Sequence, residues 1–275
     1  MKKSIIWLAS YPKSGNTWAR IFLANYLANP PKPLPINEAH RFCMGDTIAK
    51  TYHKVAGRQI NTQDVDLTLQ LRPKVLAGIV GNNADVNFVK THNIRSVARE
   101  VTLIPPEVTR SAIYIMRNPL DMVLSYARHY GMTPAVAVAH IGNEDNANAA
   151  DGQSVAQFLG SWSGHVKSWT SPSPYPVLVL RYEDLLEDPE AQFERVLTHI
   201  GIPVDKARLK KAVEFASFKE LSRQEESAGF IERPVQSEKF FAKGEAGQWK
   251  DDLDKSLIVE IKRTHRKVMK KYGYL

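Results

Sequence analysis

Four short apolar runs recur along the chain, each bounded by polar or turn-forming residues. They cover residues 5–9, 87–90, 112–116 and 176–180. Runs of this length are typical of strands that are buried on both faces of a parallel sheet. We therefore expect four parallel strands.

Helical patterns follow these runs at varying distances. They cover residues 18–27, 120–130 and 189–200, and a basic helical pattern covers 254–272. Pro119 suits a first helical turn, Asp188 an N-cap and Gly201 a C-cap. Strands alternating with helices predict an α/β fold, with a central parallel sheet flanked by helices. No domain boundary is visible, so we expect one domain over residues 1–275.

Two segments lack a regular pattern. Residues 131–152 are polar and rich in small side chains, which predicts a surface loop or a weak helix. Residues 228–250 contain Gly229, Pro234, Gly244 and Gly247, and we expect a long loop that is ordered in itself or by a ligand. There is no internal repeat and no low-complexity tract.

Composition narrows the class of ligand without choosing one. The 275 residues are 43% hydrophobic, enough for a sizeable core. The formal net charge of +8 favours anionic partners: nucleotides, sulfate esters, nucleic acid or an acidic membrane.

Cysteine content and the first residues bear on location. Cys43 is the one cysteine, which excludes an intramolecular disulfide and a cysteine-based zinc site and favours the cytoplasm. Met1-Lys2-Lys3 before an apolar run is similar to the start of a signal peptide. The run stops at Ser10-Tyr11-Pro12 without a small-residue cleavage site, so we expect a buried strand. No other segment approaches the length that spans a membrane.

The most informative segment is Tyr11-Pro-Lys-Ser-Gly-Asn-Thr-Trp18, between the first strand and its helix. A tight loop there directs backbone N–H groups and the positive end of the helix at one point. Lys13 adds a mobile charge, and Ser14, Asn16 and Thr17 add short polar side chains. The loop is not a Walker A sequence, because Lys13 precedes the single Gly15. It predicts an anion cradle sized for a phosphate.

Chemical groups also follow the second and third strands. Lys90-Thr91-His92 ends the second strand, where ligands of open α/β sheets bind and where a histidine can act as general base. Arg117 ends the third strand, and Ser125 lies one to two turns into the next helix. A guanidinium with a hydroxyl predicts a second phosphate site. We expect Asp121 to cap or brace its turn.

Two further elements complete the set. Tyr182 follows the fourth strand and is placed to face an aromatic base, whereas capping and pairing with Arg181 explain Glu183 and Asp184 better than metal binding does. In the 228–250 loop, Lys243-Gly244 suits closure over an anion through an ammonium group and a backbone N–H.

Taken in order, these motifs resemble the cytosolic-type sulfotransferase family over residues 5–250. The resemblance implies a P-loop-NTPase-like fold and 3′-phosphoadenosine 5′-phosphosulfate (PAPS) as donor, without a metal. Residues 11–18, including Gly15, resemble the 5′-phosphosulfate loop, Arg117 and Ser125 the 3′-phosphate site, and Lys243-Gly244 the C-terminal cofactor loop. Trp18, Tyr182 and Phe218 match the residues around adenine. His92 matches the catalytic base.

The sequence departs from the family pattern at three places. Ala242 stands where an arginine usually precedes the Lys-Gly pair, so one 3′-phosphate contact is lost or supplied elsewhere. Gly-Gln-Trp replaces Gly-Asp-Trp at 247–249. The short dimerisation motif is not recognisable after Lys250, where Asp254-Lys255 replaces Thr-Val, so the oligomeric state stays open. Gly-Asn-Thr-Trp with Ala9-Ser10 before it resembles bacterial members.

The resemblance implies transfer of a sulfuryl group to a hydroxyl of a small molecule. His92 takes the acceptor proton, Lys13 stabilises the bridging oxygen of the leaving 5′-phosphate, and Lys90 contacts the sulfuryl oxygens or that phosphate. The acceptor pocket is expected in residues 36–59, 129–152 and 225–239. The list of its aromatic side chains, Phe42, Tyr52, Tyr130 and Phe230, hints at an aromatic or natural-product acceptor.

Two alternatives remain at this point. An ATP-dependent small-molecule kinase shares the strand–loop–helix arrangement but expects Mg²⁺ and a lysine before the helix, where Asn16 and Thr17 stand. A nonenzymatic polyanion-binding protein would use the basic residues of 262–271, although a solvated helix face explains them better. We expect neither a nucleic acid nor a membrane as partner.

Overall fold

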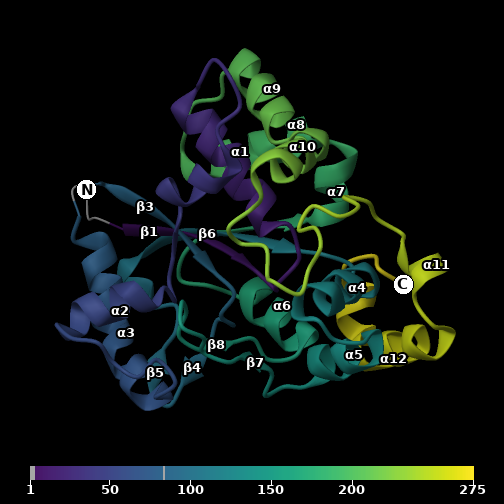
Figure 1. Ribbon diagram of the computed structural model, residues 1–275, viewed down its shortest axis with the longest axis horizontal. Coiled ribbons are helices and arrows are strands. Elements are labelled where there is room, and N and C mark those ends of the chain that lie inside the picture. The colour runs from purple at the N-terminus through teal and green to yellow at the C-terminus, as the bar shows by residue number, and fades with distance from the viewer. Residues whose placement is uncertain (1–3, 83) are drawn as a thin grey trace.

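A five-stranded parallel sheet forms the centre of the computed structural model, which describes residues 4–82 and 84–275 (Figure 1). The strand order is β2-β3-β1-β6-β9. The strands are β1 (Ser4–Ser10), β2 (Met44–Gly45), β3 (Val86–Thr91), β6 (Thr109–Met116) and β9 (Val177–Arg181). The predicted α/β class is confirmed, as are the four predicted strands. The edge strand β2 was not predicted, because two residues are too short to form a pattern. Met1–Lys3, part of the signal-peptide comparison, lie outside the described residues.

The central strands are buried on both faces, as their unbroken apolar sequences require. In β1, Ile5, Trp7 and Ala9 point into one core, whereas Ile6 and Leu8 point into the other. Successive side chains of a strand alternate between the faces of a sheet, so one apolar run supplies both cores.

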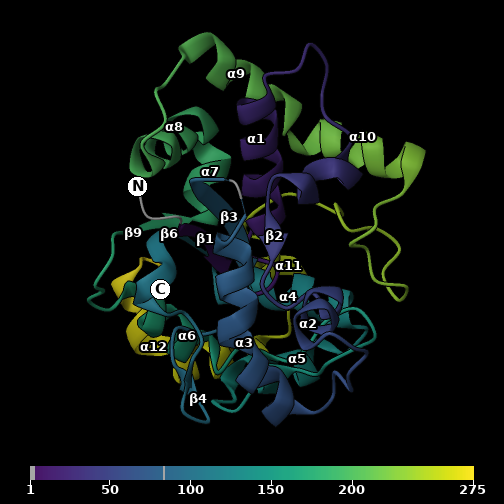
Figure 2. The same cartoon turned by 90° about the vertical axis from the view of Figure 1, so that its left-hand side faces the viewer.

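Helices cover both faces of the sheet (Figures 1 and 2). One layer consists of α1 (Asn16–Ala28), α7 (Tyr182–Glu187), α8 (Pro189–Ile200), α9 (Lys206–Phe215) and α10 (Phe218–Ala228). The other consists of α3 (Val65–Val80), α4 (Pro119–Tyr130), α5 (Pro134–Gly142), α6 (Trp162–Thr170) and α12 (Lys255–Lys271).

Shorter elements complete the chain. They are the helices α2 (Ala49–Ala56) and α11 (Trp249–Asp252), the 3₁₀ turns η1 (Ile36–Arg41) and η2 (Pro106–Val108), and the paired strands β4 (Val97–Ala98) with β5 (Val101–Thr102) and β7 (Ala147–Asn148) with β8 (Gln157–Phe158). Within the described residues, no helix has the length and apolar character needed to cross a membrane.

Local capping chemistry places α8 as the sequence predicts. The side chain of Asp188 accepts a hydrogen bond from the N–H of Ala191 at 2.9 Å, and Gly201 ends the helix with a φ of +75°. Residues 131–152, expected as a loop or weak helix, contain α5 and β7.

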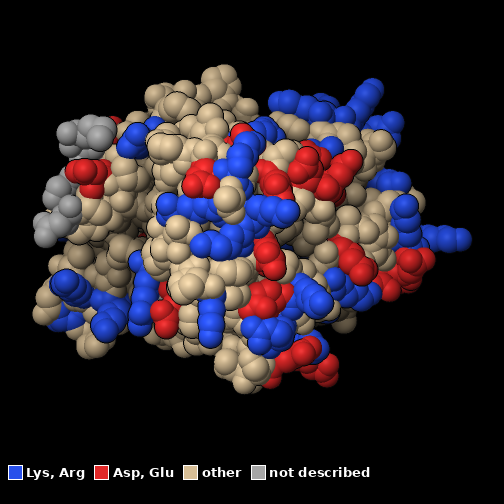
Figure 3. Space-filling model, turned by 90° about the horizontal axis from the view of Figure 1, so that it is seen from above, with Lys and Arg blue, Asp and Glu red and all other residues tan. Residues whose placement is uncertain are grey.

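All strands of this sheet are parallel, but the direction in which strands are added across the sheet changes at β1, and this creates the site. From β1 the sheet extends to β3 on one side and to β6 on the other, so the loop after β1 lies at the switch point, where ligands of such sheets bind. The segment between α10 and α11, yellow-green in Figure 1, crosses in front of these strand ends. Figure 3 shows Lys and Arg interspersed with Asp and Glu on the face seen from above.

Candidate active site

A cavity of about 730 Å³ lies at the carboxyl ends of the central strands. With the exception of Ser14, every predicted site residue lines it: Lys13, Gly15, Asn16, Thr17, Trp18, Lys90, His92, Arg117, Ser125, Tyr182, Phe218, Lys243 and Gly244. Ser14 is fully buried and does not line the cavity, and its hydroxyl has no hydrogen-bond partner in the described part of the chain. The fold therefore assembles segments more than 200 residues apart into one site.

The loop after β1 has an unusual backbone. Lys13 has a φ of +67° and Gly15 a φ of +102°. A Cβ on Gly15 would lie 2.8 Å from Cδ2 of Tyr182, so glycine meets both the backbone and the space requirement. Asn16 donates to the carbonyl oxygen of Leu8 at 2.8 Å, which ties the start of α1 to β1.

His92 is held in one tautomer. Its Nδ1 lies 2.8 Å from the carbonyl oxygen of Ser10, which can only accept, so Nδ1 carries the proton and Nε2 is free to accept one. Burial and the charge of Lys90 hold the pKa of His92 well below its usual value, so the ring is neutral near pH 7.

Two hydrogen bonds in series position the backbone of His92. Nε2 of His165 lies 3.1 Å from the carbonyl oxygen of His92, and Nδ1 of His165 lies 2.9 Å from the hydroxyl of Tyr114. Both side chains are fully buried. The sequence carried no signal for this pair, because His165 lies in α6, remote from every motif.

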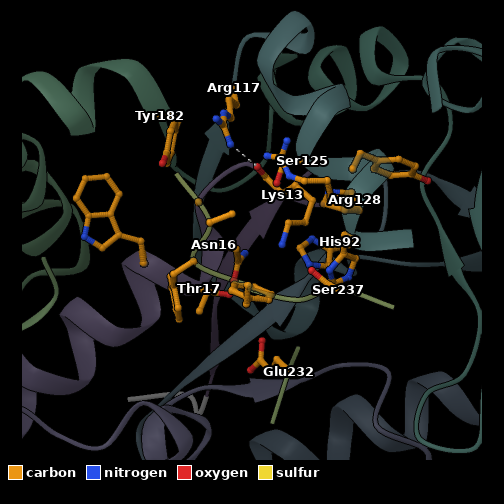
Figure 4. A pocket seen from close by; sticks show the side chains of 18 of the residues that line it. Lys13, Asn16, Thr17, His92, Arg117, Ser125, Arg128, Tyr182, Glu232 and Ser237 are labelled. Carbon is orange, nitrogen blue, oxygen red and sulfur yellow. Dashed lines mark hydrogen bonds between the residues drawn. The ribbon is translucent and has the colours of Figure 1, made fainter. Parts of the chain in front are cut away.

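Two lysines and a carboxylate lie beside His92. Burial and the neighbouring cations, Lys90 first among them, lower the pKa of Lys13 to about 7. The ammonium of Lys90 lies 3.7 Å from Glu232, whose carboxylate also accepts from buried Arg20 at 2.6 and 2.8 Å. Burial alone would raise the pKa of Glu232, but Lys90 and Arg20 hold it well below its usual value. Figure 4 shows Glu232 across the cavity from Arg117.

Arg117 lies at the end of β6. Its guanidinium donates to the carbonyl oxygens of Lys13 at 3.3 Å and Glu245 at 3.1 Å, and it lies 4.3 Å from the centre of the Tyr182 ring. Ser125 lines the same part of the cavity from α4 (Figure 4). The arrangement leaves guanidinium N–H groups and a hydroxyl at a second, separate position for an anion.

Three aromatic side chains, those of Trp18, Tyr182 and Phe218, line one wall of the cavity. The rings of Trp18 and Tyr182 meet edge to face, 5.9 Å apart. A Cβ on Gly244 would lie 2.2 Å from Phe218, so this glycine permits the closing loop to pack on that ring. These faces suit a flat heteroaromatic base.

The 228–250 loop is fixed by carboxylates. Asp121 accepts from the N–H groups of Gly247 at 2.8 Å and Trp249 at 3.1 Å. Asp121 thus braces this loop, whereas Asn118 caps its own helix by accepting from Leu120. This corrects the expectation that Asp121 would cap or brace its own turn.

The acidic residues after β9 have structural partners, which are the predicted Arg181 for Asp184, and Asn118 and Tyr274 for Glu183. Glu183 accepts from the N–H of Asn118 and from the hydroxyl of Tyr274, both at 2.9 Å. Asp184 lies 3.5 Å from Arg181. Within the described residues, no three His, Cys, Asp or Glu side chains are grouped to hold a metal ion.

The expected acceptor segments contribute unequally. Residues 129–152 and 225–239 line the cavity, whereas residues 36–59 do not. Of the four expected aromatic side chains, only Tyr130 lines it; Tyr52 and Phe230 are buried elsewhere. No sequence motif indicated Tyr126 and Arg128, two lining residues of α4, and Glu232 lay in an expected acceptor segment without an assigned role.

Comparisons with known proteins identify the family that this sequence matches. The family model described as "Sulfotransferase domain" matches residues 3–273. Cytosolic sulfotransferase 12 of Arabidopsis thaliana is 25% identical over 99% of this chain and 79% of its own length. Sulfotransferase 1 family member D1 of Mus musculus is 26% identical over 90% of this chain and 77% of its own.

Solved structures show the same fold. Mouse sulfotransferase SULT7A1 complexed with PAP has a TM-score of 0.62 at 19% identity, over 100% of this chain and 90% of that one. Retinol dehydratase in complex with androsterone and inactive cofactor PAP has a TM-score of 0.65 at 17% identity, over 98% and 82%.

Proposed function

The chain belongs to the sulfotransferase domain family and is a PAPS-dependent sulfotransferase, and we propose that His92 is its catalytic base and an aromatic or natural-product hydroxyl compound its acceptor. The kinase alternative finds no support in the family match. The observation that carries the proposal is the hydrogen bond from Nδ1 of His92 to Ser10, which leaves Nε2 able to accept a proton beside two lysines.

The reaction follows from these positions. Nε2 of His92 takes the proton of the acceptor hydroxyl while the acceptor oxygen bonds to sulfur. The bond from sulfur to the bridging oxygen of the 5′-phosphate breaks, and 3′,5′-diphosphoadenosine (PAP) leaves. Lys13 stabilises the charge on that bridging oxygen, and Lys90 stabilises the sulfuryl oxygens. The proton on His92 then passes to solvent. The step requires no metal.

The donor occupies the cavity along the set of predicted residues. The cavity-lining residues of the loop, Lys13, Gly15, Asn16 and Thr17, hold the 5′-phosphosulfate through backbone N–H groups and the start of α1, whereas Ser14 is buried behind them. The adenine lies among Trp18, Tyr182 and Phe218. The 3′-phosphate binds Arg117 and Ser125. Lys243-Gly244 closes over the nucleotide.

The remaining lining residues support the proposed acceptor class. Tyr126, Tyr130, Met132 and Phe240 contribute aromatic and apolar side chains to the lining of the cavity that also contains His92. The polar lining residues include Asn148, Ser154 and Gln157. This composition suits an aromatic or largely apolar scaffold that carries hydroxyl groups.

We also propose that residues 1–275 form one catalytic domain located in the cytoplasm. The site draws on β1, β3, β6 and the 228–250 loop, which lie along most of the chain. The single buried cysteine suits a reducing compartment.

The proposed acceptor is tested with ³⁵S-labelled PAPS and a panel of phenols, hydroxylated polyketides, sterols and sugars. We expect label transfer to phenolic or polyketide hydroxyls, unchanged by EDTA. Transfer to sugars alone would refute the acceptor class, and loss of activity in EDTA would refute the metal-free step. Transfer of phosphate from ATP and Mg²⁺ would favour the kinase alternative.

A further inference from the structure

Two arginines and a hydroxyl line one end of the cavity. Arg117 leaves the end of β6, and Ser125 and Arg128 lie three residues apart on α4, which places them on one face of that helix. Figure 4 shows the three side chains at the end of the cavity opposite Glu232. Arg128 belongs to none of the motifs in the sequence.

Within the described residues neither arginine forms an ion pair, although the charge of Asp252 acts on Arg128 from a distance. Arg117 donates only to the neutral carbonyls of Lys13 and Glu245, and its Nε is buried without a partner. Arg128 has no hydrogen-bond or ion-pair partner among the described residues. Arg128 is exposed, and its partial desolvation together with the neighbouring charge of Arg117 lowers the pKa of its guanidinium.

The nearby carboxylates are already engaged. Asp121 accepts from the backbone of Gly247 and Trp249, and Asp252 lies 2.6 Å from the ammonium of Lys243. The strand β6 and the helix α4 thus keep the like charges of Arg117 and Arg128 near each other. An anion of charge −2 bound between them would stabilise this arrangement. Lys13, the third cation of this wall, belongs to the loop after β1.

We propose that Arg128 is a ligand of the donor's 3′-phosphate, which it holds together with Arg117 and Ser125. The inference rests on the proposed donor site. It identifies the source of the charge that is missing at Ala242, a neutral lining residue of the closing loop. Because Arg128 extends from a helix, this phosphate contact does not depend on closure of the 228–250 loop.

The test compares two nucleotides that differ in the 3′-phosphate. Isothermal titration calorimetry measures the affinity of the full-length enzyme for PAP and for adenosine 5′-monophosphate. We expect Arg128→Ala to weaken PAP binding about 10- to 100-fold, since a charge-assisted contact is lost, and to change binding of the monophosphate less than about threefold. Arg128→Gln, which retains more of the side chain, should weaken PAP binding to the same extent. Arg128→Lys should recover part of the affinity for PAP.

Two controls sharpen the result. Arg195→Ala removes one positive charge from an exposed site on α8 and is expected to change neither affinity. Arg128→Ala combined with Ala242→Arg is expected to recover PAP affinity by moving the charge to the loop.

The outcomes separate this inference from the donor assignment. If the unmodified enzyme does not prefer PAP to the monophosphate, the donor site itself is wrong. If it does, and Arg128→Ala weakens both nucleotides equally or neither, the role of Arg128 is refuted while the donor assignment stands.

Discussion

The imidazole Nδ1 of His92 lies 2.8 Å from the carbonyl oxygen of Ser10, the last residue of β1. The loop that follows β1 carries Lys13, so one strand end both orients the base and begins the anion cradle. The hydrogen bond fixes the tautomer in which Nε2 is the acceptor, and burial together with Lys90 keeps the ring neutral. One backbone segment thus positions both the proposed base, His92, and the proposed stabiliser of the leaving phosphate, Lys13.

A first prediction concerns the acid limb of the pH profile. Protonated His92 cannot act as a base, so activity is lost as pH falls through its pKa. Because that pKa is depressed, kcat/KM of the enzyme is expected to start falling only below pH 6.5.

Lys90→Met provides the comparison for this profile. Removing a like charge raises the pKa of His92, so the acid limb moves to higher pH even though overall activity is lower. A limb in the unmodified enzyme at or above pH 6.5, or a shift in the opposite direction, would show that the protonation of His92 does not set this limb.

A second prediction concerns Lys13, whose pKa is about 7 before ligand binds. An anionic nucleotide favours the ammonium form, so binding above pH 7 requires uptake of a proton. The dissociation constant for PAP should therefore rise with pH above 7, at most tenfold per pH unit. Calorimetry in buffers of different ionisation enthalpy should detect proton uptake at pH 8 and little at pH 6. In Lys13→Arg, which stays charged, both effects should disappear; their persistence would assign the proton to another group.

A third prediction concerns the ion pair between Arg20 and Glu232, which ties the 228–250 loop to α1. Arg20 is 2% exposed, so removing its partner leaves a buried charge. Glu232→Gln should lower the free energy of unfolding by about 3 kcal/mol, measured by urea denaturation. Adding Arg20→Met should cost less than the sum of the single changes. Glu194→Gln, which breaks an exposed pair with Lys206, serves as control and should cost less than about 0.5 kcal/mol. Strict additivity would argue against the tie.

A fourth prediction uses two glycines with left-handed backbones. Gly15 has Tyr182 against its Cα, whereas nothing lies within 4 Å of a Cβ on Gly57. Gly57→Ala should cost about 1 kcal/mol of stability through backbone strain alone. Gly15→Ala should cost at least about 1 kcal/mol more, because the methyl group displaces Tyr182, and should also weaken PAP binding. Equal effects on stability would mean that Tyr182 moves away freely.

The central sheet was predictable because its strands are buried on both faces and form unbroken apolar runs. The ends of those strands then indicated where Lys13, His92 and Arg117 would meet. The edge strand β2 lacks such a signal, since two residues of pairing with β3 leave no pattern.

The rest of the site depends on packing between distant segments. Glu232 lies in a loop without periodicity, and its partner Arg20 reads as an ordinary polar residue of α1. Phe240 lies with its ring centre 3.7 Å from the ammonium of Lys13, a contact between residues that no local rule connects. Phe42 and Tyr52 were expected near the acceptor for their aromatic character, but Tyr52 is buried where it donates to the carbonyl of Asp46.

The role of His92 is tested most directly by single-turnover transfer of ³⁵S from bound PAPS to an acceptor identified in the screen. His92→Ala should slow this step by at least about 10²-fold, the scale of general-base catalysis, and should bind PAP within about threefold of the unmodified enzyme. His199→Gln, which keeps a donor for the carbonyl of Ala112 at the opposite end of the strands, should transfer label at the normal rate. Near-normal transfer by His92→Ala would contradict the account.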